Sequence, residues 1–431
     1  MTKKAAAPSI RFKGFSDAWE QRKLGDMMNV TSVKRIHQSD WTDSGVRFLR
    51  ARDIVAAAKN EEPDDYLYIS KEKYEEYSAL SGKVGVSDLL VTGVGTIGVP
   101  YLVRNLEPLY FKDGNIIWFQ NSDKIDGKFL FYSFSAEQIH GFINESAGIG
   151  TVGTYTIESG KKTPISLPNQ IEQAKVGEFF QQLDNLITLH QRKYEKLTNV
   201  KKSMLEKMFP QNGSSYPEIR FKGFTDPWEQ RKLSEMCGTF EYGLNAAAKE
   251  FDGKNKYIRI TDIDDVSREF LLSDLSSPDI CLDGMSKYLL SSGDVVFART
   301  GASVGKTYIY RENDGIVYFA GFLIRAKVNQ DNDAEFVFQS TLSPSYEKYI
   351  RITSQRSGQP GVNAQEYSEY DLFAPSKEEQ QRIGHFLRGI DHLITLHQRK
   401  PPHKKRRCSD VNRYEANRFV LRFFCKMGYG V

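Results

Sequence analysis

The sequence predicts an α+β fold. Two tandem units of mixed sheet and helices are joined by two long antiparallel coiled-coil helices, with pseudo-twofold symmetry. Three observations lead there. The stretch "IRFKGFSDAWEQRKLGDM" from Ile10 recurs from Ile219, at an offset of 209, with 14 of 18 positions identical. The octapeptide "LITLHQRK" recurs unchanged at 186–193 and 393–400, an offset of 207. Each octapeptide lies in a long heptad pattern. Such matches indicate a tandem duplication of a unit of about 200 residues.

The composition is that of a folded protein. The chain has 431 residues, of which 40% are hydrophobic and 26% charged, and this length allows two or three domains. It contains no apolar run of membrane-spanning length and no apolar core of a signal peptide near the N-terminus. The cysteines are scattered (Cys237, Cys281, Cys408 and Cys425). This favours a reducing cytoplasm over a disulfide scaffold or zinc ribbon. A net charge of +4 permits a nucleic-acid partner without requiring one.

The bodies between the matched ends diverge. Residues 28–160 and 237–366 share only a few short similar stretches, which we call echoes. Each copy therefore has a constant first segment (the entrance), a variable body and a constant last segment (the exit). We expect Trp19 and Trp228 to pack each entrance segment into its own body. The echoes are "RARDI" (50–54) with "RITDI" (259–263), "SDLLVTGVGTIGVPYLV" (87–103) with "GDVVFARTGASVGKTYIY" (293–310), and "INESAGIGTVGTY" (143–155) with "ITSQRSGQPGVN" (352–363).

One echo resembles a phosphate-binding loop, because Gly305, Lys306 and Thr307 supply its last three residues. The motif requires a glycine where Thr300 stands, and Gly301 is one residue too close. The equivalent loop of the first copy has no lysine, and a strand-like pattern rather than a helix follows both loops. The sequence therefore favours a glycine turn between two strands. Nucleotide binding, and a polar turn that faces a ligand such as DNA, remain alternatives.

The constant exit of the first copy predicts a helix from about Gln170 to Met208, about 55 Å long. A Pro-Asn start and the stop "FPQNGSSYP" (209–217) bound it. Lys201 alone breaks its apolar seam. Residues 374–400 repeat the design, and we expect the two helices to pair antiparallel rather than each to cover only its own domain.

The chain departs from the repeat after Lys400. Pro401 and Pro402 break the helix, and we interpret "HKKRR" (403–407) as an accidental basic run. His190 and His397 fall on the predicted seam, where polar coiled-coil positions explain them better than a metal site. We predict no metal and no cofactor in this chain.

The organisation resembles the specificity subunit of type I restriction–modification systems. The resemblance rests on the duplicated "WEQRKL" entrances at 19–24 and 228–233, and on two divergent bodies closed by "P-x-x-x-E-Q". A "D-x-L-I" helix beginning at Asp184 or Asp391 follows each body, and the glycine turns are also similar. The resemblance covers residues 8–400 and fails beyond them.

The resemblance implies that each body is a target recognition domain, which reads one half of a split site in double-stranded DNA. The helices would form an antiparallel coiled coil that fixes the spacing and docks two methyltransferase subunits. These partners would bind S-adenosylmethionine and recruit restriction subunits that use ATP and Mg²⁺. The chain itself would have no catalytic centre, and it contains no "NPPY" or "DPPY" tetrapeptide. The implied regions are 8–167 (first target recognition domain), 168–209 (central spacer helix), 210–217 (linker), 218–373 (second target recognition domain), 374–400 (distal helix) and 401–431 (atypical tail).

Polar side chains on the predicted loops are the candidates for base and phosphate contacts. The DNA-binding candidates are Lys34, Arg35, Arg47, Arg50, Arg52, Thr92, Thr96, Asn144, Ser146, Arg259, Arg299, Thr300, Ser303, Lys306, Gln355, Arg356, Gln359 and Asn363. The candidates for the spacer helices and subunit docking are Leu183, Ile187, His190, Tyr194, Leu197, Ile390, Ile394 and His397.

Overall fold

The structure, a computed structural model, describes residues 8–398 apart from 122, 148–152, 212 and 356–357. The tail predicted at 401–431 lies outside these residues. The described chain divides into two compact units, with the division between Ile187 and Thr188. We call them unit 1 and unit 2. Within the described ranges, no helix is both long and apolar enough to cross a membrane.

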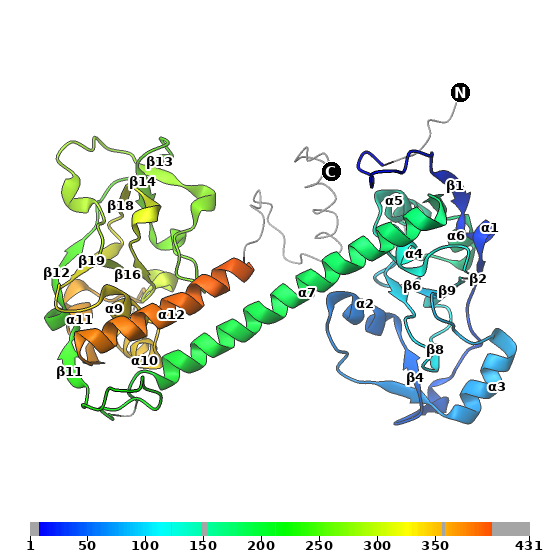
Figure 1. The fold of residues 1–431 in the computed structure, drawn as a ribbon, viewed down its shortest axis with the longest axis horizontal. Helices are drawn as coiled ribbons and strands as arrows, with labels where there is room; N and C mark the ends of the chain where they lie inside the picture. Colours follow the sequence, from blue (N-terminus) through cyan, green and yellow to red (C-terminus); the bar gives the residue numbers. More distant parts are fainter. Residues whose placement is uncertain (1–7, 122, 148–152, 212, 356–357, 399–431) are drawn as a thin grey trace. The chain divides into compact units, whose positions relative to one another are not determined.

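Unit 1 alternates short strands with helices (Figure 1). Its elements are β1 (Glu20–Lys23), α1 (Leu24–Met27), β2 (Asn29–Thr31), η1 (Gln38–Asp40), β3 (Trp41–Thr42), β4 (Val46–Leu49), α2 (Ala51–Lys59), β5 (Leu67–Ile69), α3 (Lys71–Ser81), β6 (Leu89–Thr92), β7 (Pro100–Leu102), β8 (Leu109–Phe111), β9 (Ile116–Gln120), α4 (Gly127–Ser133), α5 (Glu137–Ser146), α6 (Ile157–Lys162), β10 (Pro164–Leu167) and the first part of α7 (Gln170–Lys207).

Unit 2 begins in the second part of α7. Its further elements are β11 (Glu229–Lys232), α8 (Leu233–Met236), β12 (Cys237–Tyr242), β13 (Ala248–Glu250), β14 (Lys256–Ile258), η2 (Ile260–Asp262), η3 (Leu272–Asp274), β15 (Ser276–Pro278), η4 (Ser286–Tyr288), β16 (Asp294–Ala298), η5 (Gly301–Ser303), β17 (Thr307–Ile309), η6 (Glu312–Asp314), β18 (Val317–Phe319), β19 (Leu323–Val328), α9 (Ala334–Ser340), α10 (Pro344–Thr353), α11 (Ala364–Ser368), β20 (Asp371–Ala374) and α12 (Lys377–Gln398).

The two bodies share the strand order of their main sheet although their sequences diverge. Unit 1 has an antiparallel sheet in the order β2-β9-β6-β7, and unit 2 has the matching order β12-β19-β16-β17. A parallel strand pair stands beside each sheet, β4 with β8 and β14 with β18. The apolar side chains of the central strands are buried in both units, as in β6 and β16. The predicted α+β class and the duplication are confirmed.

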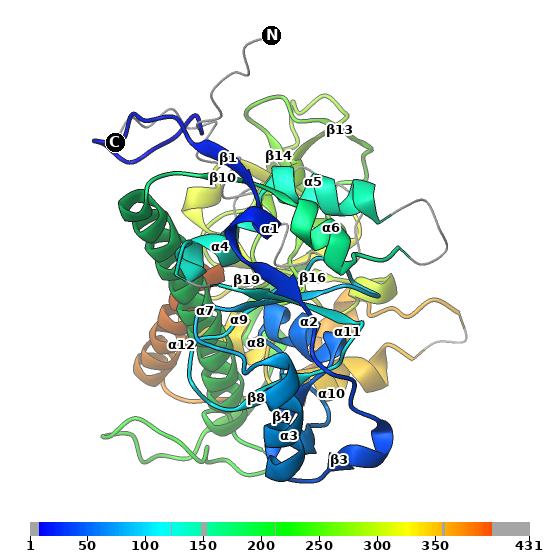
Figure 2. The ribbon, with the colours of Figure 1, turned by 90° about the vertical axis from the view of Figure 1, so that its right-hand side faces the viewer.

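A set of contacts that we call the clamp closes each body by joining its entrance to its exit. Strand β1 pairs with β10 in unit 1 (Figure 2), and β11 pairs with β20 in unit 2. Arg11 donates two hydrogen bonds to Glu172 at 2.6 and 2.7 Å, and Arg220 donates two to Glu379 at 2.8 Å. Both glutamates are almost fully buried. The pKa of each arginine is raised, because its carboxylate partner favours the charged form.

The entrance tryptophans also pack as predicted. Trp19 contacts the ring of Phe129 with a centroid distance of 5.8 Å and an interplanar angle of 65°. Trp228 contacts Phe336 with the same distance and angle. The two phenylalanines are counterparts in the repeat, so the constant segments retain their geometry around bodies of different sequence.

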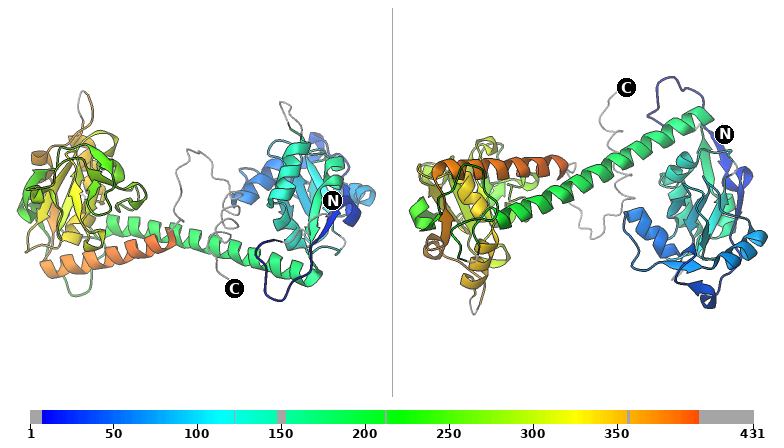
Figure 3. Two further views of the ribbon diagram at one scale, coloured as in Figure 1. Left: turned by 90° about the horizontal axis from the view of Figure 1, so that it is seen from above. Right: turned by 60° about the horizontal axis from the view of Figure 1, so that its bottom comes forward.

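Within unit 2, the second part of α7 and α12 run antiparallel (Figure 3). Along this seam His190 Nδ1 lies 2.8 Å from His397 Nδ1, and Lys201 forms an ion pair with Asp391 at 2.5 Å. Lys201 was predicted as a break in the seam, but it is a buried position with a carboxylate partner on the facing helix. Among the described residues, no cluster of three or more metal-ligating side chains is present.

Candidate nucleic-acid interface

Two predicted loop segments of unit 2 lie side by side and form what we call the turn surface of that unit. The first is the β16–β17 turn, residues 299–306, and the second is the segment 358–363. The amide of Gly301 donates to Pro360 O at 3.0 Å, and the amide of Val362 donates to Arg299 O at 2.9 Å. Thr300 and Gly361 form an antiparallel bridge. Candidates that are 60 residues apart in sequence therefore share one surface.

The turn surface of unit 1 has the same construction. The β6–β7 turn, residues 93–99, lies beside residues 153–155. Tyr155 N donates to Gly93 O at 2.8 Å, and Val94 forms a bridge with Thr154. By position, Gly93 corresponds to Arg299 and Val94 to Thr300. One backbone scaffold thus presents different side chains in the two units.

The turns themselves are glycine turns between antiparallel strands, as predicted. Gly301 and Gly305 have φ angles of +70° and +81°, and Gly95 and Gly98 have +76° and +77°. Gly93, at the start of the unit 1 turn, is not among the glycines with positive φ. A Cβ there would lie 2.6 Å from the carbonyl oxygen of Tyr155, so close backbone approach requires this glycine.

A phosphate loop needs a helix N-terminus directly after its glycines. Here the short η5 leads into strand β17, which pairs with β16. The ammonium of Lys306, which would have to reach the phosphates, instead forms an ion pair with Asp265. The geometry does not form a nucleotide-binding loop.

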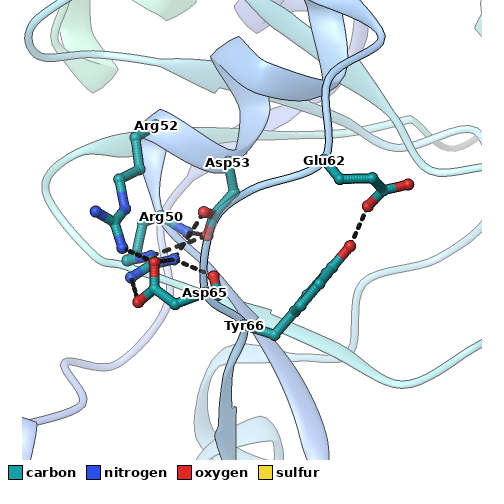
Figure 4. A network of polar contacts seen from close by, with 6 residues as sticks. All are labelled: Arg50, Arg52, Asp53, Glu62, Asp65 and Tyr66. Carbon is teal, nitrogen blue, oxygen red and sulfur yellow. Dashed lines mark hydrogen bonds and ion pairs between the residues drawn. The ribbon is translucent and has the colours of Figure 1, made fainter. Parts of the chain in front are cut away.

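Figure 4 shows a polar cluster that contains two of the arginine candidates. Arg50 is the N-cap residue of α2, where its amide donates to Asp53 Oδ2 at 2.8 Å. Its guanidinium donates to Asp53 Oδ1 at 2.9 Å and to Asp65 Oδ2 at 2.8 Å. Arg52 also pairs with Asp65, and Tyr66 donates to Glu62.

The charges in this cluster stabilise one another. Burial opposes the charge of Arg50, but its hydrogen bonds to Asp53 and Asp65 outweigh that effect and its pKa is raised. The hydrogen bond from Arg50 lowers the pKa of Asp65. Arg259 repeats the arrangement in unit 2, with two guanidinium bonds to Asp262 at 2.8 and 2.9 Å, and its pKa is raised by that carboxylate.

The shared "R-x-x-D" echo is therefore a structural capping motif, and both arginines are committed to it. The sequence predicts Arg50 and Arg259 as DNA-binding candidates, whereas in the structure their guanidinium groups bind Asp53 and Asp262. The signal that could have corrected this is the aspartate three residues after each arginine, which is the spacing of a capping box.

The remaining candidates differ in the exposure of their side chains. The side chains of Arg35 and Arg52 are 68% and 60% exposed, although Arg35 pairs with Asp113 at 2.9 Å. An exposed ion pair contributes little free energy, so an arginine can leave it for a DNA phosphate at little cost. The other exposed candidates are Lys34, Thr96, Asn144, Gln355, Gln359 and Asn363. The half-buried candidates are Arg47, Ser146, Arg299, Thr300, Ser303 and Lys306.

Several candidates have internal roles. Lys34 lies over the ring of Tyr77 at 4.3 Å, Arg47 over Tyr66 at 3.9 Å, and Arg299 over Tyr242 at 5.0 Å. Each cation is thus held on an aromatic face. In this way the aromatic partners orient the cations but do not remove them from the surface.

Three positions need correction. Thr92 was placed on a turn, but it ends β6, is fully buried, and its hydroxyl contacts Thr96 O at 2.5 Å and Val99 N at 2.9 Å. Asn144 and Ser146 were also placed on turns and lie in the last turns of α5. Asn363 lies on a loop as predicted, where it is the N-cap of α11 and accepts from Glu366 N at 2.9 Å. Arg356 lies outside the described residues.

The predicted docking residues also lie on helices. Leu183 and Ile187 belong to the unit 1 part of α7 and are half-buried. The others line the α7–α12 seam of unit 2. Ile390 and Ile394 are buried, and Tyr194 and Leu197 pack against the same core.

Two bodies with the same main sheet, each closed by the same clamp and each presenting a different set of turn side chains, define a tandem recognition protein. A family model described as "Type I restriction modification DNA specificity domain" matches residues 16–199 and 225–403. The chain belongs to this family of type I restriction-modification DNA specificity domains.

Individual relatives agree with this assignment. The chain is 27% identical over 200 residues to the type I restriction enzyme MjaVIII specificity subunit of Methanocaldococcus jannaschii. That match covers 43% of this chain and 44% of the relative, so the chain spans less than half the length of the curated relative. The fold is similar to that of the type I restriction-modification system S subunit from M. genitalium. The TM-score is 0.59 and the identity 13%, over 98% of both chains.

Proposed function

We propose that the chain is the DNA sequence-recognition subunit of a type I restriction–modification complex, without a catalytic centre of its own. Each unit reads one half of a bipartite duplex site. Helices α7 and α12 set the accepted spacing and dock two methyltransferase subunits. The observation that carries the proposal is the match of one DNA-specificity family model to both units.

The chemistry of the turn surfaces supports this function. Ser303 and Gln359 have side chains able to hydrogen bond to base edges, and a good bidentate contact discriminates by about 1–3 kcal/mol. The exposed guanidinium groups of Arg35 and Arg52 suit phosphate contacts, which position the protein without reading sequence. Because the two units carry different side chains on one scaffold, we expect the two half-sites to differ.

The partners follow from the same proposal. The methyltransferase subunits would bind S-adenosylmethionine, and the restriction subunits would use ATP and Mg²⁺. The complex would act in the cytoplasm. In this scheme the chain contributes only recognition and spacing, so its removal should abolish site-specific methylation and leave the cofactor sites of the partners intact.

Genome-wide mapping of methylated adenines, in cells with and without this chain, tests the proposal. We expect a split motif to be methylated only when the chain is present. An unchanged methylation map, with the partner subunits expressed, would contradict it.

Two measurements separate the proposal from other functions. A nucleotide hydrolase would bind ATP or GTP, and binding would be lost in Lys306→Ala. We expect neither the parent chain nor the Lys306→Ala variant to bind a nucleotide. An adaptor that never touches DNA would fail to shift a duplex at low salt with the methyltransferase present. A recognition subunit should give a shift that weakens steeply as salt rises.

A further inference from the structure

The β16–β17 turn of unit 2 begins at Arg299, whose backbone is fixed from two sides. Its amide donates to Phe322 O at 3.0 Å, and its carbonyl oxygen accepts from the amide of Val362 at 2.9 Å. The first bond joins the turn to the β18–β19 connection, and the second joins it to the segment 358–363. The backbone of Arg299 therefore has a defined place on the turn surface.

The side chain of Arg299 is held against an aromatic ring. Its guanidinium carbon lies 5.0 Å from the centroid of the Tyr242 ring, a distance at which a cation is attracted to an aromatic face. Tyr242 is itself held, because its hydroxyl accepts from the amide of Ala364 at 3.3 Å and its backbone pairs with Ile324. Tyr242 is 45% exposed, so its ring supports the guanidinium at the surface of the unit.

Other half-buried arginines of unit 2 are held by carboxylates instead. These pairs are Arg220–Glu379, Arg259–Asp262, Arg311–Glu335 and Arg325–Glu241. Among the described residues of unit 2, Arg299 is the only cation with a buried side-chain nitrogen, its Nε, that lacks a hydrogen-bond partner. A buried donor without a partner costs stability, so its presence needs an explanation outside the fold.

Unit 1 has no side chain at the matching point. Gly93 corresponds to Arg299 in the repeat, and its amide donates to Asn115 O at 2.7 Å. This is the same backbone bond that joins Arg299 to Phe322. The scaffold is thus the same in both units while the side chain differs, so a contact made by Arg299 would belong to one half-site alone.

The chemistry of a guanidinium held in this way favours one base. Its terminal nitrogens form a planar fork that matches the O6 and N7 acceptors of guanine in the major groove. The two backbone bonds and the aromatic support hold the fork before DNA arrives, and this lowers the entropy lost on binding. A phosphate requires only a positive charge, which a mobile lysine or arginine supplies equally well.

We propose, on the basis of the function proposed above, that Arg299 is a specificity-determining residue that reads a guanine in the half-site of unit 2. Its Nη1 and Nη2 atoms donate to O6 and N7 of that guanine. Tyr242 is its positioning residue, because the ring holds the guanidinium in the orientation that the base edge requires. Gly93 makes no such contact in unit 1.

The first test changes single atoms of the DNA and uses the full chain assembled with its methyltransferase partner. Methylation mapping supplies the split motif, and each guanine of the motif is then replaced in turn by 7-deazaguanine, which lacks the N7 acceptor. We expect one replacement, in one half-site, to weaken binding of the parent about 10-fold or more. Arg299→Ala should be indifferent to that replacement. Arg299→Lys, which keeps the charge without the fork, should be indifferent to it as well.

The second test examines the positioning role of Tyr242. Tyr242→Phe keeps the ring and should keep the sensitivity to 7-deazaguanine, whereas Tyr242→Leu should reduce it at that guanine alone. Adding Tyr242→Leu to Arg299→Ala should cause no further loss of discrimination there, because the ring acts through the arginine. Lys287 lies 5.0 Å over the ring of Tyr288 in the same unit and is the matched control, so Lys287→Ala should change no position of the motif.

The outcomes separate this inference from the proposed function. A parent complex that directs no methylation defeats both. The inference alone is overturned if the parent methylates a split motif that Arg299→Ala leaves unchanged, or if Tyr242→Leu alters positions that Arg299→Ala does not. It is also overturned if Arg299→Ala weakens binding to all sequences equally and lowers the salt slope by about 1, which is the behaviour of a phosphate contact.

Discussion

The ammonium of Lys201 lies 2.5 Å from the carboxylate of Asp391, in the seam between α7 and α12. Both side chains are at most 14% exposed, so removal of one partner leaves the other charge nearly buried. We expect Lys201→Met to lower the free energy of unfolding of unit 2 by about 3 kcal/mol. The double variant Lys201→Met/Asp391→Leu should regain most of this loss. Urea denaturation measures both, and equal losses in the single and double variants would contradict the buried pair.

The clamp predicts a contrast between two glutamates of unit 2. Glu379 is buried and receives two bonds from Arg220, whereas the side chain of Glu229 is 70% exposed in its pair with Arg231. Glu379→Gln should destabilise the unit by about 3 kcal/mol, and Glu229→Gln by less than about 1 kcal/mol. Hydrogen exchange of β20 amides reports the difference. Similar protection in both variants would show that the clamp does not stabilise the body.

The glycine turn predicts an effect of packing beyond backbone strain. Gly305 and Gly284 both have positive φ, +81° and +73°. A Cβ at Gly305 would lie 2.6 Å from Ile350 Cγ2, whereas one at Gly284 meets nothing within 4 Å. Gly305→Ala should therefore cost about 1–3 kcal/mol more than Gly284→Ala. Thermal denaturation of the two variants gives the comparison, and equal melting temperatures would argue against a tight turn.

The turn surface of unit 2 predicts a change confined to one half-site. Gln359 is exposed and borders Gly301, whose added Cβ would lie 2.9 Å from Gln359 Nε2. If Gln359 reads a base, the Gln359→Ala variant should lose about 1–3 kcal/mol of discrimination between bases at one position of one half-site. Methylation mapping would show the other half unchanged. A loss of sequence discrimination in both half-sites would show that Gln359 does not read a base directly.

The Arg50 cluster predicts a pH-dependent contribution to the stability of unit 1. The pKa of Asp65 is lowered in the folded state. The unfolded chain therefore binds the proton more readily, and Asp65 stabilises the fold above its unfolded pKa. This stabilisation is lost as pH falls through the lowered pKa. Asp65→Asn should thus be less stable than the parent near pH 7 and equal to it in strong acid. A constant difference across that range would exclude the linkage.

Local patterns predicted much of this fold, because periodicity and turn chemistry are short-range properties. The exit helices and the glycine turns were readable in that way, and the duplication was readable from the repeated segments themselves. The clamp was not, because Arg11 and Glu172 are 161 residues apart and no local pattern pairs them. Burial was equally hidden at Thr92, whose polar type suggested a surface turn. The arginines of the "R-x-x-D" echo were interpreted as surface cations, although each has an aspartate partner three residues later in the sequence.

The clamp has an evolutionary consequence. In unit 1 the last residue of β1, Lys23, is paired with the first residue of β10, Pro164, so the two borders of the body meet at one point. A crossover in the two constant segments could exchange everything between them as a cassette, without disturbing Arg11, Glu172 or the helix that follows. New pairings of recognition bodies could thus arise by recombination alone, while the surfaces required for assembly are inherited unchanged.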